Sequence, residues 1–243
     1  MPSIPIAMVT GANRGLGLET SRQLARRGIK VFMGARDETS GSSSAMILRD
    51  EGLDVVFIPL DVTNTKQIRQ VKKYIEDHFG ILDILVNNAG IMSPEEALFG
   101  NSAETISQKI LRQTFDVNFF GVVELTQALL PLIKRSNAGR IVNLSSVLGS
   151  LHYQSDESNK LKPLAYNASK TALNQFTIHL ASALKDTPIK VNSGHPGWVK
   201  TNIGGPKAPL DVIEGARTAV RLATLGSDGP TGKFFYLDEE LPW

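Results

Sequence analysis

Short apolar runs alternate with segments of helical period along this chain. Helix-length segments with that period lie at Leu16–Arg27, Thr65–Phe79, Gln113–Lys134 and Leu164–Lys185. The runs between them are rich in Val, Ile, Leu and Phe, as is typical of strands buried on both faces. The alternation predicts an α/β fold: a doubly wound parallel sheet of about seven strands with helices on both faces. The predicted strands are Ile6–Thr10, Val31–Ala35, Val55–Leu60, Leu82–Val86, Arg140–Leu144, Ile189–Ser193 and Lys233–Leu237.

Composition narrows the class of protein. The chain has no internal repeat and no linker, so residues 1–243 are expected to form a single domain. A net charge of +2 without a dense basic stripe argues against a nucleic-acid or membrane partner. Cysteine is absent, which excludes disulfides, thiolate zinc sites and cysteine nucleophiles. Neither a secretory signal at Met1–Pro5 nor an apolar stretch of about 18 residues is present, so we expect a cytoplasmic protein.

Several predicted strands are followed by polar connections. In open α/β sheets ligands bind beyond the carboxyl ends of the strands, so such connections border the predicted pocket. We therefore expect segments 93–104, 149–163 and 204–210 to be substrate-side loops. The serine-rich segment Asp37–Ser44 is instead expected to be a solvated loop that makes no contact with a ligand.

A glycine-rich turn, Thr10–Gly17, follows the first strand and opens a helix. Glycines permit a tight turn and let pyrophosphate approach the backbone, while the helix N-terminus supplies amide donors and a favourable dipole. A plain strand-to-helix turn is the alternative, but the position at the first βα junction favours a nucleotide site. The predicted cofactor contacts in this turn are Gly11, Asn13, Arg14, Gly15, Leu16 and Gly17.

The end of the second strand bears on which cofactor is bound. Arg36, together with Arg14, would make charge-assisted hydrogen bonds to a 2′-phosphate, which predicts NADP(H) over NAD(H). In the alternative both arginines are surface residues and Asp37 binds the ribose. Past the third strand Asp61 and Val62 are predicted to lie at the adenine, where Asp61 would accept from the amino group; otherwise Asp61 is a carboxylate at a helix N-terminus.

The fourth strand ends in Asn87-Asn88-Ala89-Gly90. Small residues there let the backbone come close to a ribose, and asparagine side chains can tie down the turn. We predict cofactor contacts from Asn88, Ala89 and Gly90, with a purely structural role for Asn87 as an equal alternative to a cofactor contact.

Tyr166 and Lys170 are the most informative pair in the chain. At positions i and i+4 of a helix they share one face, and a nearby cation would lower the tyrosine pKa from about 10 toward neutrality. Tyr166 would then give and accept protons at working pH, whereas taken alone the pair could be an ordinary surface contact. Ser146, at the end of the fifth strand, would donate to a substrate carbonyl. Asn118 would kink its helix and hold a water, or in the alternative it faces solvent.

The glycine turn, Asn87–Gly90, Asn118, Ser146 and Tyr166/Lys170 in this order resemble the short-chain dehydrogenase/reductase family. The resemblance spans nearly the whole chain and implies a Rossmann domain that binds a nicotinamide. It also implies catalytic roles. Tyr166 would protonate the carbonyl oxygen and Ser146, rather than Ser145, would polarise it. Lys170 would tune the tyrosine and bond the nicotinamide ribose, and the Asn118 water would link Lys170 to solvent.

The segment after the sixth strand sharpens the resemblance. A Pro-Gly turn here packs on the nicotinamide in the family, which implies cofactor contacts from Pro196, Gly197, Val199 and Thr201. This segment and the tail 229–236 are similar to the carbonyl reductase branch, which reduces ketones, aldehydes and quinones with NADPH. Leu148 and Trp198 are further candidate substrate contacts, although Trp198 is equally plausible as a core or loop-anchoring residue.

The sequence departs from the family pattern in two places. The interval between Ser146 and Tyr166 is longer than is common in the family, and the family's Val-Asp-Gly-Gly ending is missing, which favours a monomer or homodimer over a tetramer.

The expected activity is reduction of a small-molecule carbonyl. A 3-oxoacyl-thioester reductase, a steroid-type reductase and a non-catalytic NADP(H) sensor are the alternatives. The four histidines show no metal-ligand spacing, so no metal is expected.

Overall fold

The computed structural model describes residues 4–99 and 102–243 and contains an eight-stranded sheet in the order β3-β2-β1-β4-β5-β6-β7-β8. Every neighbouring pair is parallel except β7 and β8, and the predicted strands are all present. The short antiparallel edge strand β8 is the one that the sequence pattern does not predict. The strands are β1 (Ile6–Thr10), β2 (Lys30–Ala35), β3 (Val55–Pro59), β4 (Ile84–Asn87), β5 (Arg140–Leu144), β6 (Lys190–Gly194), β7 (Phe234–Tyr236) and β8 (Glu239–Glu240).

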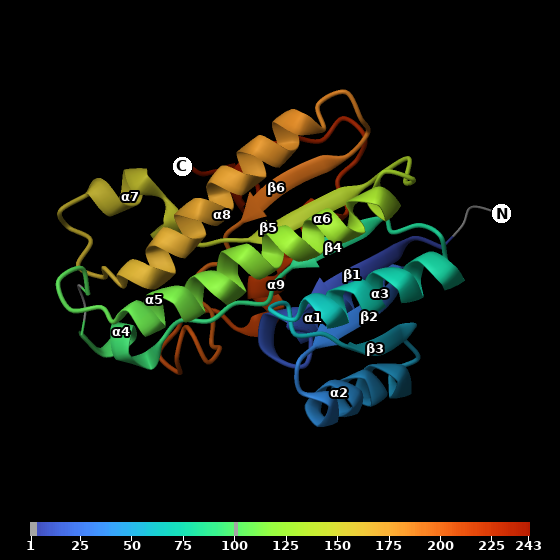
Figure 1. Cartoon of the computed structure of the whole chain (residues 1–243), viewed down its shortest axis with the longest axis horizontal. Coiled ribbons are helices and arrows are strands. Elements are labelled where there is room, and N and C mark those ends of the chain that lie inside the picture. Colours follow the sequence, from blue (N-terminus) through green and yellow to red (C-terminus); the bar gives the residue numbers. More distant parts are fainter. Residues whose placement is uncertain (1–3, 100–101) are drawn as a thin grey trace.

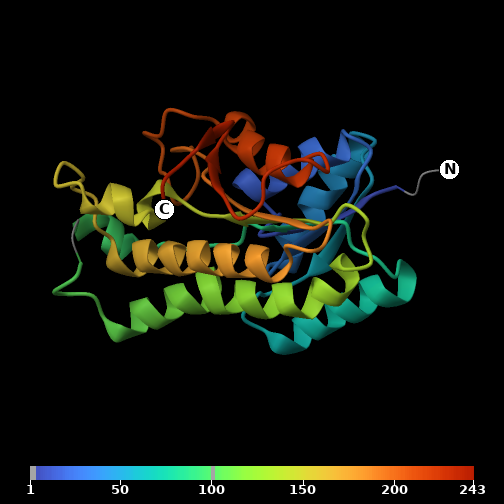
Figure 2. The same cartoon turned by 90° about the horizontal axis from the view of Figure 1, so that it is seen from above.

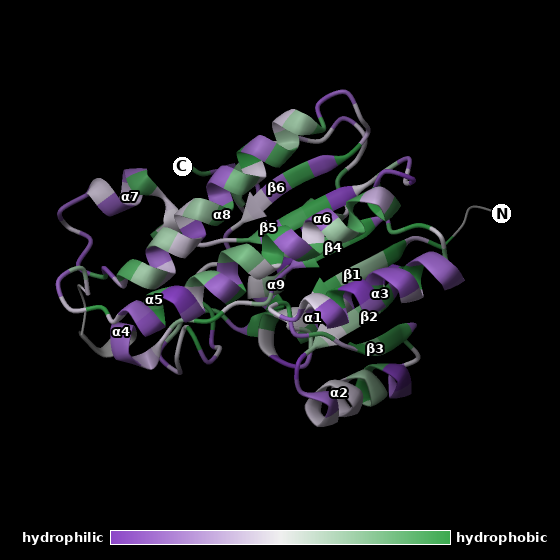
Figure 3. Cartoon of the chain, in the orientation of Figure 1, coloured by the Kyte–Doolittle hydropathy of each residue, from purple (hydrophilic) through white to green (hydrophobic). Residues whose placement is uncertain are grey.

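Helices cover both faces of this sheet (Figures 1 and 2). On one face α1 (Gly15–Ala25), α2 (Glu38–Asp50) and α9 (Val212–Ala223) pack on a core that includes Leu24 and Leu48. On the other face α3 (Thr65–His78), α6 (Gly121–Ile133) and α8 (Leu164–Ala183) pack on a core that includes Ile75 and Leu129. Burying one such side chain contributes about 1.5–3 kcal/mol, so the two cores hold the layers together. The apolar strands lie between helices whose outer faces are polar (Figure 3).

The serine-rich segment expected to be a loop is a helix, and that prediction is wrong. Asp37 caps α2 by accepting a 2.7 Å hydrogen bond from the amide of Ser40, which satisfies one of the free donors of the first turn. Gly41 allows the helix to sit directly against the ring of Phe57, because a Cβ there would lie 2.1 Å from the ring. Tertiary packing therefore overrides the weak helix propensity of the serines.

Two of the predicted substrate-side loops also contain helical turns. Segment 93–104 includes α4 (Pro94–Phe99), and segment 149–163 includes α7 (Leu151–Ser155), which follows the 3-10 turn η2 (Val147–Gly149). Residues 100 and 101 of the first segment lie outside the described residues, as do Met1–Ser3 of the N-terminal segment on which the secretory-signal argument depends.

One continuous helical stretch, Gln108–Ile133, lies along one face of the sheet. It consists of α5 (Gln108–Phe115), the π-helical turn η1 (Asp116–Phe120) and α6, so the irregularity expected at Asn118 is present as a π turn. By length and composition this is the one helix among the described residues that is apolar enough to span a membrane. Its buried Leu125, Leu129 and Leu132 pack in the core beside the sheet, as expected of a core helix.

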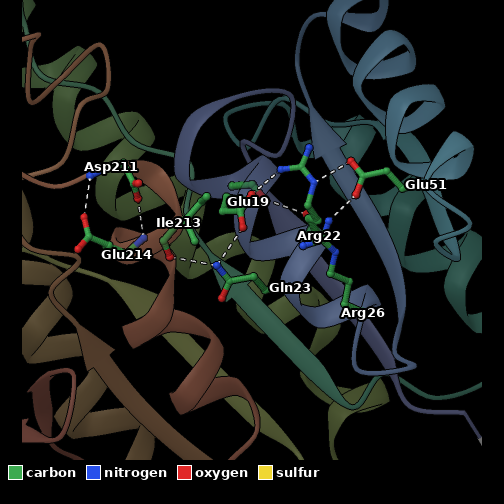
Figure 4. A network of polar contacts seen from close by, with 10 residues as sticks. Glu19, Arg22, Gln23, Arg26, Glu51, Asp211, Ile213 and Glu214 are labelled. Carbon is green, nitrogen blue, oxygen red and sulfur yellow. Dashed lines mark hydrogen bonds and ion pairs between the residues drawn. The ribbon is translucent and has the colours of Figure 1, made fainter.

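A polar network fastens α1 to its neighbours (Figure 4). Arg22 pairs with both Glu19 and Glu51, and the second pairing ties α1 to the end of α2. The side-chain amide of Gln23 donates to Glu19 at 2.9 Å and to the carbonyl of Ile213 at the start of α9 at 3.0 Å. These contacts fix the position of α1, whose first turn carries the glycine-rich segment.

Candidate active site

The glycine turn between β1 and α1 is held by close backbone packing. Gly11 has a φ of 62°, in the left-handed region that favours glycine. A Cβ at Gly17 would lie 2.3 Å from the carbonyl oxygen of Gly11, so a side chain there would force the turn open. The side-chain amide of Asn88 donates to the carbonyl oxygens of Thr10 at 2.7 Å and Gly11 at 3.2 Å. Asn88, predicted to contact the cofactor, thus uses its side-chain donors to fasten the turn to the end of β4.

Three predicted cofactor segments meet at one edge of the sheet. A Cβ at Gly11 would lie 3.0 Å from the Cα of Ala89, and one at Gly15 would lie 3.7 Å from the Cγ2 of Thr201. The segments follow β1, β4 and β6, and the strand order reverses between β1 and β4, where nucleotides bind in folds of this kind. The arrangement fits a dinucleotide, because the turn is free of side chains at Gly11, Gly15 and Gly17 and opens onto the N-terminus of α1.

Two arginines stand exposed at the predicted adenosine end of the site. Arg14 is the residue before α1 and makes no capping bond with its side chain, and Arg36 follows β2. Neither forms an ion pair with any residue that the structure describes. The rival residue, Asp37, uses its Oδ1 to cap α2, and hydrogen bonds from the side chain and the backbone amide of Ser40 lower the pKa of its carboxyl. Asn13 donates to the Ser40 hydroxyl at 2.9 Å, so the glycine turn and the start of α2 form one surface.

At the predicted adenine position Asp61 has one oxygen in use. Its Oδ1 accepts from the backbone amide of Thr63 at 2.9 Å and from the Thr63 hydroxyl at 2.7 Å. The helix that follows is capped by Asn64 rather than by Asp61. Val62 is buried, and its carbonyl group packs against Gly121 at the start of α6. The second oxygen of Asp61 has no hydrogen bond among the described residues and can accept from a ligand.

The segment after β6 turns sharply at Pro196 and Gly197. Gly197 has a φ of 83°, and Val199 pairs with Leu210 in an isolated bridge. The Thr201 hydroxyl accepts from the amide of Gly204 at 3.1 Å, which closes a turn within the segment.

Trp198, in the same segment, is a loop-anchoring residue. It is 57% exposed, and its indole Nε1 donates to the carbonyl of Gly204 at 2.8 Å. Of the alternatives weighed for this tryptophan, the structure therefore favours the anchor over a substrate contact.

Tyr166 and Ser146 meet at the end of β5. Tyr166 lies in the first turn of α8 and is 7% exposed, and the Ser146 hydroxyl lies near enough to its phenol to act on the pKa of that phenol. Ser146 Oγ also accepts from the amide of Leu148 at 3.2 Å, which fixes its rotamer. The neighbouring Ser145 hydroxyl has no hydrogen-bond partner among the described residues. The sequence-based preference for Ser146 over Ser145 agrees with this geometry.

Lys170 lies one turn along α8, buried behind the tyrosine. Its Nζ is 5.7 Å from the centre of the Tyr166 ring and donates a 2.7 Å hydrogen bond to the carbonyl of Leu144. With 4% of its surface exposed, Lys170 has little water around its ammonium group. The predicted i and i+4 pair is therefore a buried pair and not a surface contact.

Burial dominates the ionisation of both groups. It raises the pKa of Tyr166 to about 12, while the hydrogen bond from Ser146 acts in the opposite direction. It lowers the pKa of Lys170 to about 8. The prediction that Lys170 brings the tyrosine pKa toward neutrality is wrong for this structure, because desolvation of the phenolate outweighs a cation that is bonded elsewhere.

Asn118, in the π turn, has its amide engaged by protein groups. Oδ1 accepts from the backbone amide of Ile91 at 2.8 Å, and Nδ2 donates to the carbonyl of Ile91 at 2.8 Å and to the Ser169 hydroxyl at 3.0 Å. A Cβ at Gly90 would lie 3.4 Å from Asn118 Oδ1 and 3.5 Å from Lys170 Nζ. Gly90 thus keeps the space between these two side chains free.

Two cavities lie in this part of the molecule, one between the segment after β4 and α5 and one at the segment after β5. One of about 300 Å³ is lined by Ile91 and Gln113 among others, and a second of about 460 Å³ is lined by Leu148, Tyr153, His195 and Tyr236 among others. Leu148, predicted as a substrate contact, therefore lies in a cavity wall that directly follows Ser146.

His195 is a site residue that the sequence reasoning missed. Its ring lies 5.4 Å from that of Tyr236, and its Nδ1 is buried without a partner among the described residues. Burial lowers the pKa of His195 to about 4, so the imidazole is neutral at pH 7. Its place directly before Pro196, at the carboxyl end of a strand, is the signal that could have identified it. Within residues 4–99 and 102–243 no cluster of three or more histidines and carboxylates could hold a metal.

Known proteins share these features. The family model described as short chain dehydrogenase matches residues 5–209. Carbonyl reductase [NADPH] 1 of Mus musculus is 33% identical, with 99% of each chain covered. Short-chain dehydrogenase/reductase 1 of Saponaria officinalis is 34% identical over 98% of this chain and 95% of its own length.

Solved structures give the same result. The NADPH-bound carbonyl reductase from chicken fatty liver has a TM-score of 0.86 and is 26% identical, with 99% of each chain covered. Salutaridine reductase from Papaver somniferum has a TM-score of 0.83 and is 31% identical, with 96% of this chain and 99% of that chain covered. With this similarity along its whole length and a buried Tyr-Ser-Lys group, the chain belongs to the short-chain dehydrogenase/reductase family of oxidoreductases, which act on carbonyl and alcohol groups.

Proposed function

We propose that this chain is an NADPH-dependent carbonyl reductase that interconverts a ketone or aldehyde and an alcohol, with Tyr166 as the general acid and base. The observation that carries the proposal is the buried phenol of Tyr166, which has the Ser146 hydroxyl beside it and Lys170 one turn along the same helix. Curated relatives named carbonyl reductase, neomenthol dehydrogenase and salutaridine reductase support the same reaction class.

Tyr166 and Ser146 together suit a carbonyl oxygen that becomes an alkoxide. When bound, the nicotinamide supplies a hydride at its C4. With a pKa well above neutrality, the Tyr166 phenol keeps its proton at pH 7 and can give it to that oxygen. The Ser146 hydroxyl, oriented by the amide of Leu148, polarises the same oxygen. Donors that are already in place need no reorganisation as charge develops.

Lys170 and Asn118 suit the return of the proton. Lys170, with a pKa of about 8, is mostly an ammonium group at pH 7 and can resupply a proton to Tyr166. Oδ1 of Asn118 keeps one free acceptor position, and Gly90 leaves the space toward Lys170 open. We propose that Asn118 holds a water there, which links Lys170 to solvent.

The proposed preference for NADP(H) depends on Arg14 and Arg36. Both are exposed beside the glycine turn, and Asp37, which would otherwise bind the ribose hydroxyls, is used as the cap of α2. Two guanidinium groups at this position favour a 2′-phosphate. We also propose that the protein is cytoplasmic, for which its lack of cysteine is a supporting observation, and that it works as a monomer or homodimer.

The direct test is oxidation of NADPH with a panel of ketones, aldehydes and quinones, with NADH as the control cofactor. Tyr166→Phe should lower kcat by about 10²–10⁴-fold and leave NADPH affinity near that of the wild type. Tyr74→Phe, at a half-exposed tyrosine on α3, is the matched control and should keep full activity. Substantial turnover by Tyr166→Phe would remove this tyrosine from the proposed role.

A further inference from the structure

The helix that carries Tyr166 starts without a cap of its own. The residue before α8 is Pro163, which has no side-chain donor or acceptor, and no side-chain capping bond comes from it. The first amide groups of a helix have no partner within the helix and must be satisfied from elsewhere. In α8 these groups include the amides of Leu164 and Ala165, the two residues directly before Tyr166.

Two residues from a different part of the chain supply the missing acceptors. Oε1 of Glu96, on α4, accepts a 2.7 Å hydrogen bond from the amide of Ala165. The hydroxyl of Ser102 accepts from the amide of Leu164 at 2.9 Å and donates to the same Glu96 oxygen at 3.0 Å. Figures 1 and 2 show α4 beside the start of α8. Glu96 and Ser102 thus cap α8 from a distant part of the sequence. Glu96 is 69 residues from Ala165, and Ser102 is 62 residues from Leu164.

Glu96 and Ser102 are both buried, so their polar atoms bond to protein groups rather than to solvent. Glu96 is 1% exposed and Ser102 is 4% exposed. The second carboxyl oxygen of Glu96, Oε2, has no hydrogen bond among the described residues, and Glu96 forms no ion pair with them. Burying a carboxylate is costly unless it is bonded, and here its bonds and the positive end of the helix dipole provide the compensation. All of its polar interactions are directed at Ser102 and the first turn of α8.

We propose that Glu96 and Ser102 are positioning residues for Tyr166: by capping the first turn of α8 they keep the phenol within hydrogen-bonding reach of Ser146. The inference rests on the proposed function. Tyr166 is the residue after Ala165, so fraying of the first turn would displace the phenol directly. Proton transfer is sensitive to small displacements of the donor, whereas the glycine turn and Asn88–Gly90, the predicted nucleotide contacts, lie outside α8. The pair therefore acts on the chemical step and not on cofactor binding.

The test compares Glu96→Ala with Glu96→Gln in the full chain, with NADPH and the best carbonyl substrate found in the panel. Gln keeps an oxygen that can accept both hydrogen bonds. We expect Glu96→Ala to lower kcat at least tenfold with an NADPH KM within twofold of the wild type, and Glu96→Gln to stay within threefold in both. NADPH deuterated at C4 should give a larger isotope effect on kcat in Glu96→Ala, because the chemical step becomes more rate-limiting.

Asn64→Ala is the matched control. Asn64 caps α3 through bonds to the amides of Lys66 and Gln67, so its loss removes a helix cap far from Tyr166. It should lower the unfolding midpoint as Glu96→Ala does, with kcat at saturating NADPH unchanged. If Glu96→Ala does not fold, Ser102→Ala against Ser102→Thr carries the test, with a loss of at least threefold in kcat expected for Ala alone.

The inference is overturned if wild type is active and Glu96→Ala keeps kcat within twofold, or if its isotope effect is unchanged. A wild type that is inactive with every carbonyl compound would contradict the proposed function instead.

Discussion

Asn118 and Ile91 are joined by two reciprocal hydrogen bonds of 2.8 Å each: the side chain of Asn118 accepts one from the backbone amide of Ile91 and donates the other to the Ile91 carbonyl. Asn118 comes from the π turn in the long helix, and Ile91 directly follows Gly90 in the segment after β4. The pair therefore sets the distance between the helix and the nicotinamide-side backbone. A third bond, to Ser169, connects the same amide to the helix that carries Tyr166 and Lys170.

Asn118→Ala should destabilise the fold by about 2–3 kcal/mol, because it leaves two buried backbone groups of Ile91 unpaired. The matched control is Asn174→Ala. Asn174 is also a buried helical asparagine, but its one bond within the described residues is a long contact of 3.4 Å to Gly149. Urea unfolding at pH 7 measures both variants. Equal losses in the two would mean that the Ile91 bonds contribute nothing specific.

Lys170 should determine the alkaline limb of the pH–rate profile for carbonyl reduction. Its pKa is about 8 and that of Tyr166 about 12, so as pH rises the ammonium charge is lost well before the phenol proton. In the wild type, kcat/KM should fall as pH rises through about 8. Lys170→Met should be slower at pH 7 and should lack this limb. The exposed control Lys66→Met should keep it, and a limb that persists near pH 8 in Lys170→Met would assign it to another group.

Arg36→Asp should weaken NADPH binding by about 100-fold, because it removes a charge-assisted bond to the 2′-phosphate and adds repulsion; such a bond contributes about 1.5–3 kcal/mol. NADH affinity should be unchanged or higher. Arg49→Asp makes the same charge change at the exposed far end of α2 and serves as the control. Fluorescence titration with each cofactor gives the ratio, and a ratio unchanged from the wild type would show that Arg36 does not read the phosphate.

His195 should make the fold sensitive to acid. Its pKa is about 4 in the folded protein against 6.5 for an unperturbed histidine, so the unfolded chain binds the extra proton first. Stability is then lost as pH falls from about 6.5 to about 4, by up to ~3 kcal/mol. His195→Gln should lose less stability across this window than the wild type in urea unfolding. His179→Gln, at an exposed histidine, should behave like the wild type. An acid sensitivity unaltered in His195→Gln would contradict the assignment.

Patterns that are local in the chain could be predicted from the sequence alone. Apolar runs specify strands buried on both faces, and the order of those runs with helices between them specifies the parallel sheet and its handed crossovers. The carboxyl ends of the strands then bring the glycine turn, Asn87–Gly90, Ser146 and the Pro196 segment to one edge. Tyr166 and Lys170 share a helix face for the same geometric reason.

What depends on partners far apart in sequence was decided only by the tertiary structure. The serine-rich segment 37–44 forms part of a helix because that helix packs against Phe57. The pKa of Tyr166 is raised because tertiary packing buries its phenol, which the residues near it in the sequence do not indicate. The Glu96 cap, the Ile91 bonds of Asn118 and the unpartnered His195 follow from contacts across 27 or more residues or from burial. Hydrophobic periodicity records which face of an element is inside. It does not record which polar groups will meet there or how much water they will lose, and these two quantities set the chemistry of the site.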